Sequence, residues 1–313
     1  MGITAAVGAV RVTDLAGVDR GVVARWSLAS AHLMPHGGPA IVRALATELA
    51  RRFGEPVCPL MDTAALLALY PEAADELEAR MLHTLASAAS PLAIDLLLDQ
   101  PRRWRALEST TRRRLESAPA GDPSLAPATL ARLIHPPLVV ALGAPNIGKS
   151  SLLNALAGRS VALVANEPGT TRDYVGVLLD LGGLVVRYAD TPGIRDGGGA
   201  TETDARTAAL ALARSADVLL LCGDATAPPP DAATLPHGVA DPPAQDAAVR
   251  GDAIVPPSIC VALRTDRGRP TWPHDAATSG ALGHGLDGLA RFITDRLVPA
   301  DALADLRPWR FWD

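Results

Sequence analysis

The sequence predicts an α/β protein whose main domain has a mainly parallel sheet with helices on both faces, preceded by a small α/β unit and a helical segment. Short apolar runs with β-branched residues lie at 137–142, 185–189, 218–221 and 259–263. Such runs are typical of strands buried on both faces. Helical patterns follow the first run at 152–158 and the last at 285–297, as expected for strands joined through helices.

Composition limits the class of protein. Hydrophobic residues make up 48% of the 313-residue chain, enough for a packed core, and the net charge of −5 argues against a strongly basic nucleic-acid binder without excluding a local basic face. No charged segment precedes an apolar N-terminal stretch, and no apolar run reaches about 18 residues, so we expect neither a signal peptide nor a membrane span. Cys58, Cys222 and Cys260 have no metal-ligand spacing and fit a reduced, cytoplasmic location.

Lysine and asparagine are almost absent from this arginine-rich chain. Of its 29 basic residues only Lys149 is a lysine, and its asparagines are Asn146, Asn154 and Asn166. Their placement around one short stretch indicates that this stretch needs a particular chemistry.

A glycine-rich loop surrounds this lysine. Residues 143–151 read GAPNIGKSS and lie between a predicted strand and the helical sequence LLNALAG, which is the context of a phosphate-binding P-loop. Backbone N–H groups and the helix N-terminus would bind phosphates, Lys149 would reach the β- and γ-phosphates, and the Ser150 hydroxyl would bind Mg²⁺. The predicted nucleotide-binding set here is Asn146, Ile147, Gly148, Lys149, Ser150 and Ser151.

Two later motifs have the order expected of a nucleotide switch. The second strand ends in DTPG at 190–193, where Asp190 could hold Mg²⁺ through water and the Gly193 N–H could sense the γ-phosphate. The intervening PGTTRD at 168–173 is a polar loop whose threonine could complete the Mg²⁺ shell. Taken alone, Asp190 could also be an ordinary turn residue at a strand end.

The last motif concerns the base. Residues 263–266 read LRTD where a GTPase has Asn/Thr-Lys-x-Asp, and the Asp266 carboxylate could accept hydrogen bonds from guanine N1 and N2, a donor pair that adenine lacks. Backbone N–H groups of the following Ser279 and Gly280 could meet guanine O6. Alone, Asp266 could be a turn residue, but the ordered series predicts a P-loop GTPase G domain that binds and hydrolyses GTP. Leu263 and Arg264 depart from the motif, so we expect weaker affinity, with Arg264 stacking over the base.

The sequences GAPNIGKSSLLNALAG, PGTTRD and DTPG resemble the TrmE/Era/Der branch of GTPases. The motif HGGP at 36–39 and the sequence GAVRV at 8–12 are similar to the N-terminal domain of the tRNA-modification GTPase family MnmE/TrmE. The resemblance implies a GTP-hydrolysing switch in tRNA wobble-uridine modification. The alternatives are an Era/Der-like ribosome-associated GTPase and a weakly hydrolysing GTP-binding regulatory module.

The resemblance also implies a cation-assisted mechanism. Ile194 follows DTPG where many GTPases have a water-orienting glutamine, and in the family a K⁺ ion supplies charge instead. By position, Asn146, Thr170 and the backbone of Ala165 and Glu167 would bind K⁺, and Thr171 would bind Mg²⁺. The family's water-orienting glutamate corresponds to Glu202, although Glu202 could equally be the first-turn acid of a helix capped by Thr201. The predicted catalytic set is therefore Lys149, Asn146, Glu202 and Gly193.

This sequence departs from the family in three places. No cysteine follows Cys260, whereas the family ends in a cysteine motif. Sixteen residues follow residue 297, which we expect to be too few for the chain to return to a helical domain. His32 stands where the family has an acid, which argues against a folate-derivative site. The expected partners are GTP and GDP, with tRNA or rRNA and a homodimer through the G domains or the N-terminal unit as further candidates, and no membrane.

The expected organisation has four parts. Residues 1–60 form a small α/β unit with a strand at 5–12 and a helix at 41–52, residues 61–134 are helical, residues 135–298 form the G domain with a proline-rich disordered insert at 224–257, and residues 299–313 form a tail that docks its aromatic side chains on the core. Helices are expected to begin after Asp62, at Pro71 and after Ser90. His36 either shapes a turn or contacts a ligand. Arginines between 102 and 114 form either a solvated helix face, which is favoured, or an RNA-contacting face.

Overall fold

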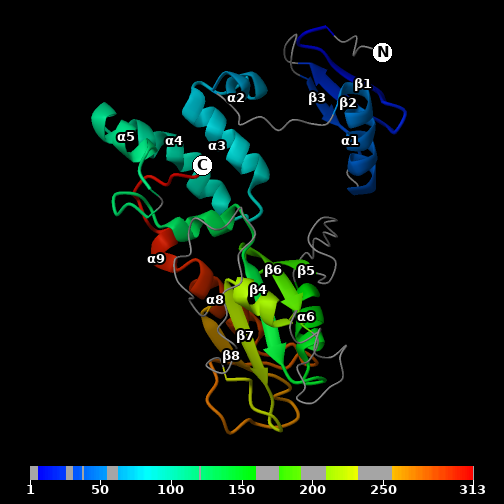
Figure 1. Cartoon of the computed structure of the whole chain (residues 1–313), viewed down its shortest axis with the longest axis vertical. Coiled ribbons are helices and arrows are strands. Elements are labelled where there is room, and N and C mark those ends of the chain that lie inside the picture. The colour runs from blue at the N-terminus through cyan, green and yellow to red at the C-terminus, as the bar shows by residue number, and fades with distance from the viewer. Residues whose placement is uncertain are drawn as a thin grey trace. The chain divides into compact units, whose positions relative to one another are not determined.

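The computed structural model describes residues 6–25, 31–36, 39–54, 63–119, 121–159, 176–191, 209–231 and 256–312. The chain divides into two compact units, the first reaching to Ala86 and the second running from Ser87 to Phe311 (Figure 1). The boundary predicted at 134/135 falls inside the second unit. No helix in these described segments is long and apolar enough to cross a bilayer.

The first unit has an antiparallel sheet in the order β1-β2-β3. Its elements are β1 (Val10–Leu15), β2 (Asp19–Arg25), β3 (Ala31–Met34), α1 (Pro39–Phe53), α2 (Thr63–Leu69) and α3 (Glu76–Ser87). Leu15 and Val23 pack with Leu45 of α1, so the helix covers one face of the sheet. The helix predicted at 41–52 is confirmed. The first strand begins later than predicted, and β2 and β3 were not predicted.

The start of α3 differs from the prediction at Pro71. Residues 71–75 form turns, and the helix begins at Glu76. The Asp75 carboxylate accepts the Glu78 backbone N–H at 2.9 Å, so an aspartate rather than a proline sets the helix start. Asp62 lies outside the described residues.

The second unit contains a six-stranded sheet in the order β5-β6-β4-β7-β8-β9. Its strands are β4 (Leu138–Gly143), β5 (Gly176–Asp180), β6 (Val185–Asp190), β7 (Val218–Gly223), β8 (Ser258–Ala262) and β9 (Ala276–Ala277). Every adjacent pair is parallel except β5 and β6. The four strands predicted from apolar runs are confirmed, and with them the α/β fold class.

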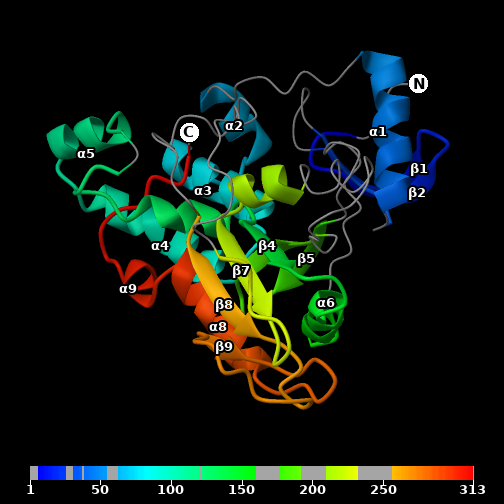
Figure 2. The same ribbon diagram turned by 60° about the horizontal axis from the view of Figure 1, so that its bottom comes forward.

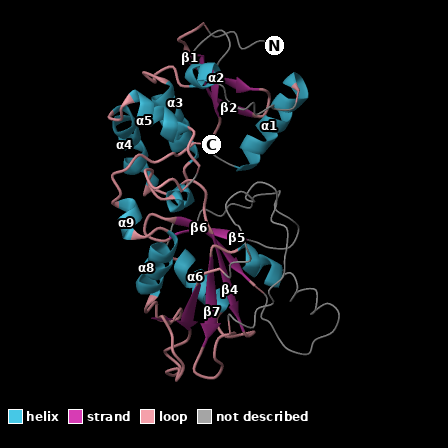
Figure 3. Cartoon of the chain, turned by 60° about the vertical axis from the view of Figure 1, so that its left-hand side comes forward, coloured by secondary structure: helices cyan, strands magenta, loops and turns pink. Residues whose placement is uncertain are grey.

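Helices lie beside this sheet, as Figures 2 and 3 show. α6 (Lys149–Ala157) contacts β4 and β6, and α8 (Leu286–Leu297) contacts β7 and β9. A further helical stretch at 209–215 contributes Ala213 to a cluster with Val140 and Leu219. Because helices cover the central strands, every residue of β7 is buried, which explains its uninterrupted apolar sequence.

The helical part of this unit consists of α4 (Ala93–Arg105), α5 (Ser109–Glu116), η1 (Ala128–Leu133) and α9 (Ala300–Leu303). Ser90, the predicted cap of α4, has a different role, because its hydroxyl accepts the backbone N–H of Val185 at 3.0 Å. Next to it, the Leu92 N–H donates to the Gly183 carbonyl at 3.1 Å. The start of α4 is therefore joined to the turn between β5 and β6.

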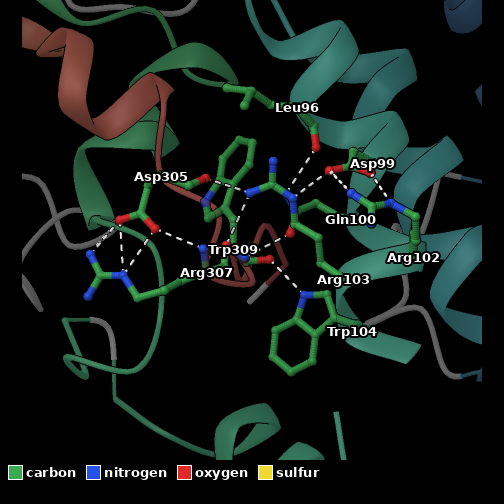
Figure 4. A network of polar contacts seen from close by, with 9 residues as sticks. All are labelled: Leu96, Asp99, Gln100, Arg102, Arg103, Trp104, Asp305, Arg307 and Trp309. Carbon is green, nitrogen blue, oxygen red and sulfur yellow. Dashed lines mark hydrogen bonds and ion pairs between the residues drawn. The ribbon is translucent and has the colours of Figure 1, made fainter. Parts of the chain in front are cut away.

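The chain after α8 returns to the helical part (Figure 4). The indole N–H of Trp104 donates to the Trp309 carbonyl at 3.0 Å, and the Trp309 N–H donates to Gln100 Oε1 at 2.8 Å. Arg103 donates to the Asp305 carbonyl at 2.5 Å. The expected lack of a return is wrong, since extended chain covers about 3.3 Å per residue and a short tail can reach far. The predicted docking of the tail is confirmed, because Trp309 and Phe311 are buried.

Several of the arginines between 102 and 114 are paired with acids. Arg102 and Arg103 bind Asp99 at 2.7 and 2.6 Å, Arg112 binds Glu116 at 2.9 Å, and Arg114 binds Asp122 at 3.1 Å. This pairing favours a helix face that serves the fold over an RNA-contacting face.

The first part of the insert predicted at 224–257 is ordered. Asp224 Oδ1 accepts the backbone N–H groups of Thr226 at 2.7 Å and Ala227 at 3.0 Å. The Trp272 indole donates to the Asp224 carbonyl at 2.9 Å. The predicted disorder is therefore wrong for residues 224–231, and residues 232–255 lie outside the described part of the chain.

Candidate nucleotide site

The loop between β4 and α6 is held by two left-handed backbone positions. Asn146 has φ 60° and Gly148, the residue before α6, has φ 112°. A Cβ at Gly148 would lie 3.3 Å from the Arg264 Nε, so glycine is favoured there by both conformation and space. The loop thus presents the N-terminus of α6 at the end of a buried strand, where anions bind readily.

Lys149, the one charged residue of this loop, is buried at 5% exposure. Its Nζ donates to the Gly143 and Ala144 carbonyls, both at 3.1 Å. Burial lowers the pKa of Lys149, while the Asp190 carboxylate acts in the opposite direction. A buried ammonium whose nearest partners are neutral carbonyls is suited to receive a phosphate, because an anion compensates its desolvated charge.

Ser150 and Asp190 meet in front of the loop. The Ser150 hydroxyl donates to Asp190 Oδ2 at 2.5 Å. The other carboxylate oxygen, Asp190 Oδ1, is buried and has no hydrogen-bond partner among the residues that the structure describes. The Thr191 hydroxyl donates to the Ala141 carbonyl at 2.7 Å and fixes the chain after β6. A hydroxyl beside an orphaned carboxylate oxygen fits Mg²⁺, which prefers oxygen ligands and keeps several waters.

The two loops predicted to read the base, at 263–266 and 279–280, also come together. The Ser279 hydroxyl donates to Asp266 Oδ1 at 2.5 Å, and this bond lowers the pKa of Asp266. The Thr265 N–H donates to the Thr278 carbonyl at 3.2 Å, which joins the two loops through their backbones. The Ser279 N–H, expected to meet guanine O6, donates here to the His284 carbonyl at 3.1 Å.

Arg264 makes a contact that the sequence did not reveal. Its φ is 53°, its side chain lies against Gly148, and its guanidinium is 3.9 Å from Asp224. Arg264 thus links the loop at 263–266, which is predicted to read the base, to the P-loop. Asp224 was not predicted because nothing in its sequence context relates it to residue 264.

The remaining predicted residues are placed as follows. Asn146 and Ser151 are exposed, and Ile147 is buried, with 3% of its surface exposed. A Cβ at Gly280 would lie 3.0 Å from the Ser151 carbonyl, so this glycine lets its loop approach α6 closely. The residues outside the described segments are Ala165, Glu167, Thr170, Thr171, Gly193 and Glu202. Within the described segments no group of three or more His, Cys, Asp or Glu side chains could hold a metal on its own.

His36 has a structural partner in the first unit. Its backbone N–H donates to Asp19 Oδ2 at 2.7 Å, and its Nδ1 lies 3.0 Å from Asp19 Oδ1. The His36 hydrogen bonds lower the pKa of Asp19. This geometry supports the turn-shaping role of His36, since the interaction fixes the end of β3 against the start of β2.

The sheet order, the P-loop and the two base-reading loops define a P-loop GTPase domain, and residues 138–241 match a family model described as a 50S ribosome-binding GTPase. The domain is similar in sequence to tRNA modification GTPases named MnmE. It is 48% identical over 133 residues to the tRNA modification GTPase MnmE of Acidiphilium cryptum, which covers 42% of this chain and 30% of that protein. The MnmE of Mesorhizobium japonicum is 58% identical over 90 residues, 29% of this chain and 20% of the relative.

A longer match is to the MnmE of Dinoroseobacter shibae, 38% identical over 167 residues, 53% of this chain and 34% of the relative. The chain therefore spans about a third or less of the curated relatives it matches. Among solved structures, Aquifex aeolicus Era bound to GDP·AlF4⁻ is similar with TM-score 0.35, 24% identity and coverage of 51% of this chain and 56% of that one. The G domain of the T. maritima FeoB iron transporter has TM-score 0.35, 24% identity and coverage of 52% and 99%.

Proposed function

We propose that this protein binds GTP and hydrolyses it to GDP and phosphate as a molecular switch. The observation that carries the proposal is the meeting of Lys149, Ser150 and Asp190 at the N-terminus of α6, where a buried ammonium, a hydroxyl and an orphaned carboxylate oxygen converge. The similarity of the surrounding domain to MnmE GTPases supports it.

The phosphate end of the site would work as follows. Backbone N–H groups of residues 146–150 bind the phosphates, and Lys149 exchanges its carbonyl partners for the β- and γ-phosphate oxygens. Ser150, Asp190 and Thr171 would hold Mg²⁺, which when bound neutralises charge on the phosphate oxygens. The Gly193 N–H would contact the γ-phosphate.

The base end of the site would select guanine. Asp266, kept ionised by the Ser279 hydroxyl, accepts from guanine N1 and N2. The Gly280 N–H would serve guanine O6, since the Ser279 N–H is engaged by His284. Arg264 would stack over the base from its position across Gly148.

Ile194 cannot orient the attacking water. Another group must therefore position the water, and a further source must supply charge in the transition state. We propose K⁺, held by Asn146, Thr170 and the backbone of Ala165 and Glu167, with Glu202 orienting the attacking water. The exposure of Asn146 supports this role, because an exposed amide side chain can turn its oxygen toward a bound phosphate.

The biological setting is proposed from the relatives. Their names as tRNA modification GTPases favour a role in tRNA wobble-uridine modification, and the description of the family model keeps a ribosome-associated role as the second candidate. A cytoplasmic switch that pairs through its G domains or its N-terminal unit fits both. A folate derivative is not part of the proposal, because His36 is engaged by Asp19. Recovery of tRNA or rRNA with the purified protein would separate the two roles.

Phosphate release from GTP by the purified full chain tests the proposed activity. We expect Mg²⁺-dependent turnover of GTP and not of ATP, and loss of turnover in Asp190→Asn. The matched control is Asp295→Asn, at an exposed aspartate of α8, which should leave turnover unchanged. Absence of turnover in the wild type, or equal turnover of ATP, would contradict the proposal.

A further inference from the structure

We infer that Arg159 is a positioning residue for guanine recognition, which it serves by fixing the loop at 279–284 that orients Asp266. The inference rests on the proposed function, because it concerns the base end of the same site. Among the residues that the structure describes, Arg159 donates to Gly283 and Asp287 and not to Asp266, so its effect on Asp266 must pass through the loop.

Arg159 lies just beyond the end of α6, the helix that begins with the P-loop lysine. Its Nη2 donates to the Gly283 carbonyl at 2.9 Å, and its Nη1 donates to Asp287 Oδ1 at 2.7 Å. Asp287 is in the first turn of α8. One guanidinium therefore joins the end of the P-loop helix to the base-reading loop and to the helix that follows it, a task that suits the planar fork of arginine better than the point charge of lysine.

The loop itself has little internal freedom. Ser279 and His284 exchange backbone hydrogen bonds at 3.1 and 3.2 Å, which close it into a narrow hairpin. Gly283 and Gly285 both have positive φ, and a Cβ at Gly285 would lie 2.0 Å from the Ala277 carbonyl. A displacement of the Gly283 carbonyl should therefore also displace Ser279.

Two points seat this hairpin on α6. Near the start of the helix, Gly280 approaches the Ser151 carbonyl, and beyond its end Arg159 holds Gly283. The Ser279 hydroxyl then fixes the Asp266 carboxylate at 2.5 Å. Since hydrogen bonds weaken steeply with misalignment, a small rotation of the hairpin would weaken the bonds from Asp266 to guanine more than the contacts to the phosphates.

Paired affinities for GDP and IDP test the inference, because hypoxanthine lacks the 2-amino group that Asp266 would bind. In Arg159→Ala we expect the preference for GDP over IDP to fall by about five- to tenfold, the size of one charge-assisted hydrogen bond in a partly exposed site. Arg159→Lys should restore part of the preference.

Arg187→Ala is the matched control, because Arg187 is also an exposed arginine that donates to a backbone carbonyl, that of Pro136, but lies away from the loop. In an Asp266→Ala background, Arg159→Ala should leave the preference unchanged.

Each outcome has one meaning. A wild-type protein that binds no GDP refutes the proposed function itself. A wild-type protein that binds GDP, with an Arg159→Ala variant that keeps the wild-type preference or loses GDP and IDP affinity equally, overturns the inference alone, because a merely structural role would weaken both nucleotides alike. If Arg159→Ala does not fold, Asp287→Asn tests the same link at a side chain that is 81% exposed, and an unchanged preference there also overturns the inference.

Discussion

The indole N–H of Trp104 donates to the backbone carbonyl of Trp309, 205 positions further along the chain. Both side chains are buried, Trp104 at 0% and Trp309 at 2% exposure. Phe311 packs edge-on against Trp309 with ring centroids 6.1 Å apart. The last residues of the second unit are therefore part of its helical core.

Removal of the Trp309 side chain should destabilise the second unit. We expect Trp309→Ala to lower the free energy of unfolding by about 3–5 kcal/mol, the usual loss for a large aromatic side chain in a core. Urea unfolding measures it. Leu306→Ala is the control, because Leu306 is in the same tail and 79% exposed, and its effect should stay within about 0.5 kcal/mol. Equal effects of the two substitutions would show that the tail is not docked in solution.

The pairing of Asp99 with two arginines should make stability sensitive to acid. Hydrogen bonds from Arg102 and then Arg103 lower the pKa of Asp99 from 3.8 to about 2. Because the folded pKa is the lower one, the stabilisation is present above pH about 4 and is lost as the pH falls toward 2. Asp99→Asn should therefore reduce the free energy of unfolding at about pH 5 and differ less from the wild type at about pH 3, as measured by urea unfolding. A difference that grows on acidification would contradict the pairing.

Lys149→Ala should abolish GTP binding without unfolding the protein. In the proposed function this lysine compensates the charge of the phosphates, and its hydrogen bonds to the Gly143 and Ala144 carbonyls lie at the start of the same loop. Fluorescent nucleotide titration measures binding, and circular dichroism checks the fold. Normal binding by this variant would show that residues 143–151 are not the phosphate site.

Asp266→Asn should shift base preference from guanine towards xanthine. The amide reverses one hydrogen-bond polarity, which matches the 2-oxo group of xanthine instead of the 2-amino group of guanine. Competition of GDP and XDP for the purified variant measures the shift. Unchanged guanine selectivity would mean that Asp266 does not read the base.

Hydrolysis should be faster in K⁺ than in Na⁺ at equal ionic strength, and Asn146→Ala should remove the difference. Loss of one preorganised charge typically slows turnover about 10²–10³-fold. Asn146 has φ 60°, which strains alanine, so Asn146→Gly removes the side-chain oxygen without that strain and serves as the companion variant. Equal rates in both salts over a range of protein concentrations, which allows for G-domain pairing, would exclude the cation mechanism.

Apolar runs located β4, β6, β7 and β8 to within two residues, because strands buried on both faces need uninterrupted apolar sequence. β2 was missed because its sequence DRGVVAR has charged ends and a glycine, and because both strands that pair with it, β1 and β3, are largely exposed. The motifs of the candidate nucleotide site could be recognised in the sequence because the residues of each motif are close together in the chain.

Contacts between distant residues could not be predicted in this way. Ser90 matched a helix cap by its neighbours, yet its hydroxyl serves Val185, 95 positions away. In the same way, Arg264 was expected only at the base, while its contacts with Gly148 and Asp224 depend on how three strand ends meet. Residue type and spacing determine which groups need partners, and the packing of the sheet determines which partners they find.

The hydrogen bonds that join Ser90 and Leu92 to the β5–β6 turn limit how far the chain can be shortened before the GTPase domain loses contacts that it needs to fold. A fragment of residues 135–298 would contain every motif of the GTPase domain, but the Val185 N–H and the Gly183 carbonyl would lose their partners. Arg132, which donates to the Leu297 carbonyl at 2.8 Å and lies 3.4 Å from Asp217, would be lost as well. A fragment made to express the GTPase domain should therefore start at or before Ser87 and extend to Trp312. A shorter fragment would expose the polar groups and apolar surface that α4 and the tail now cover.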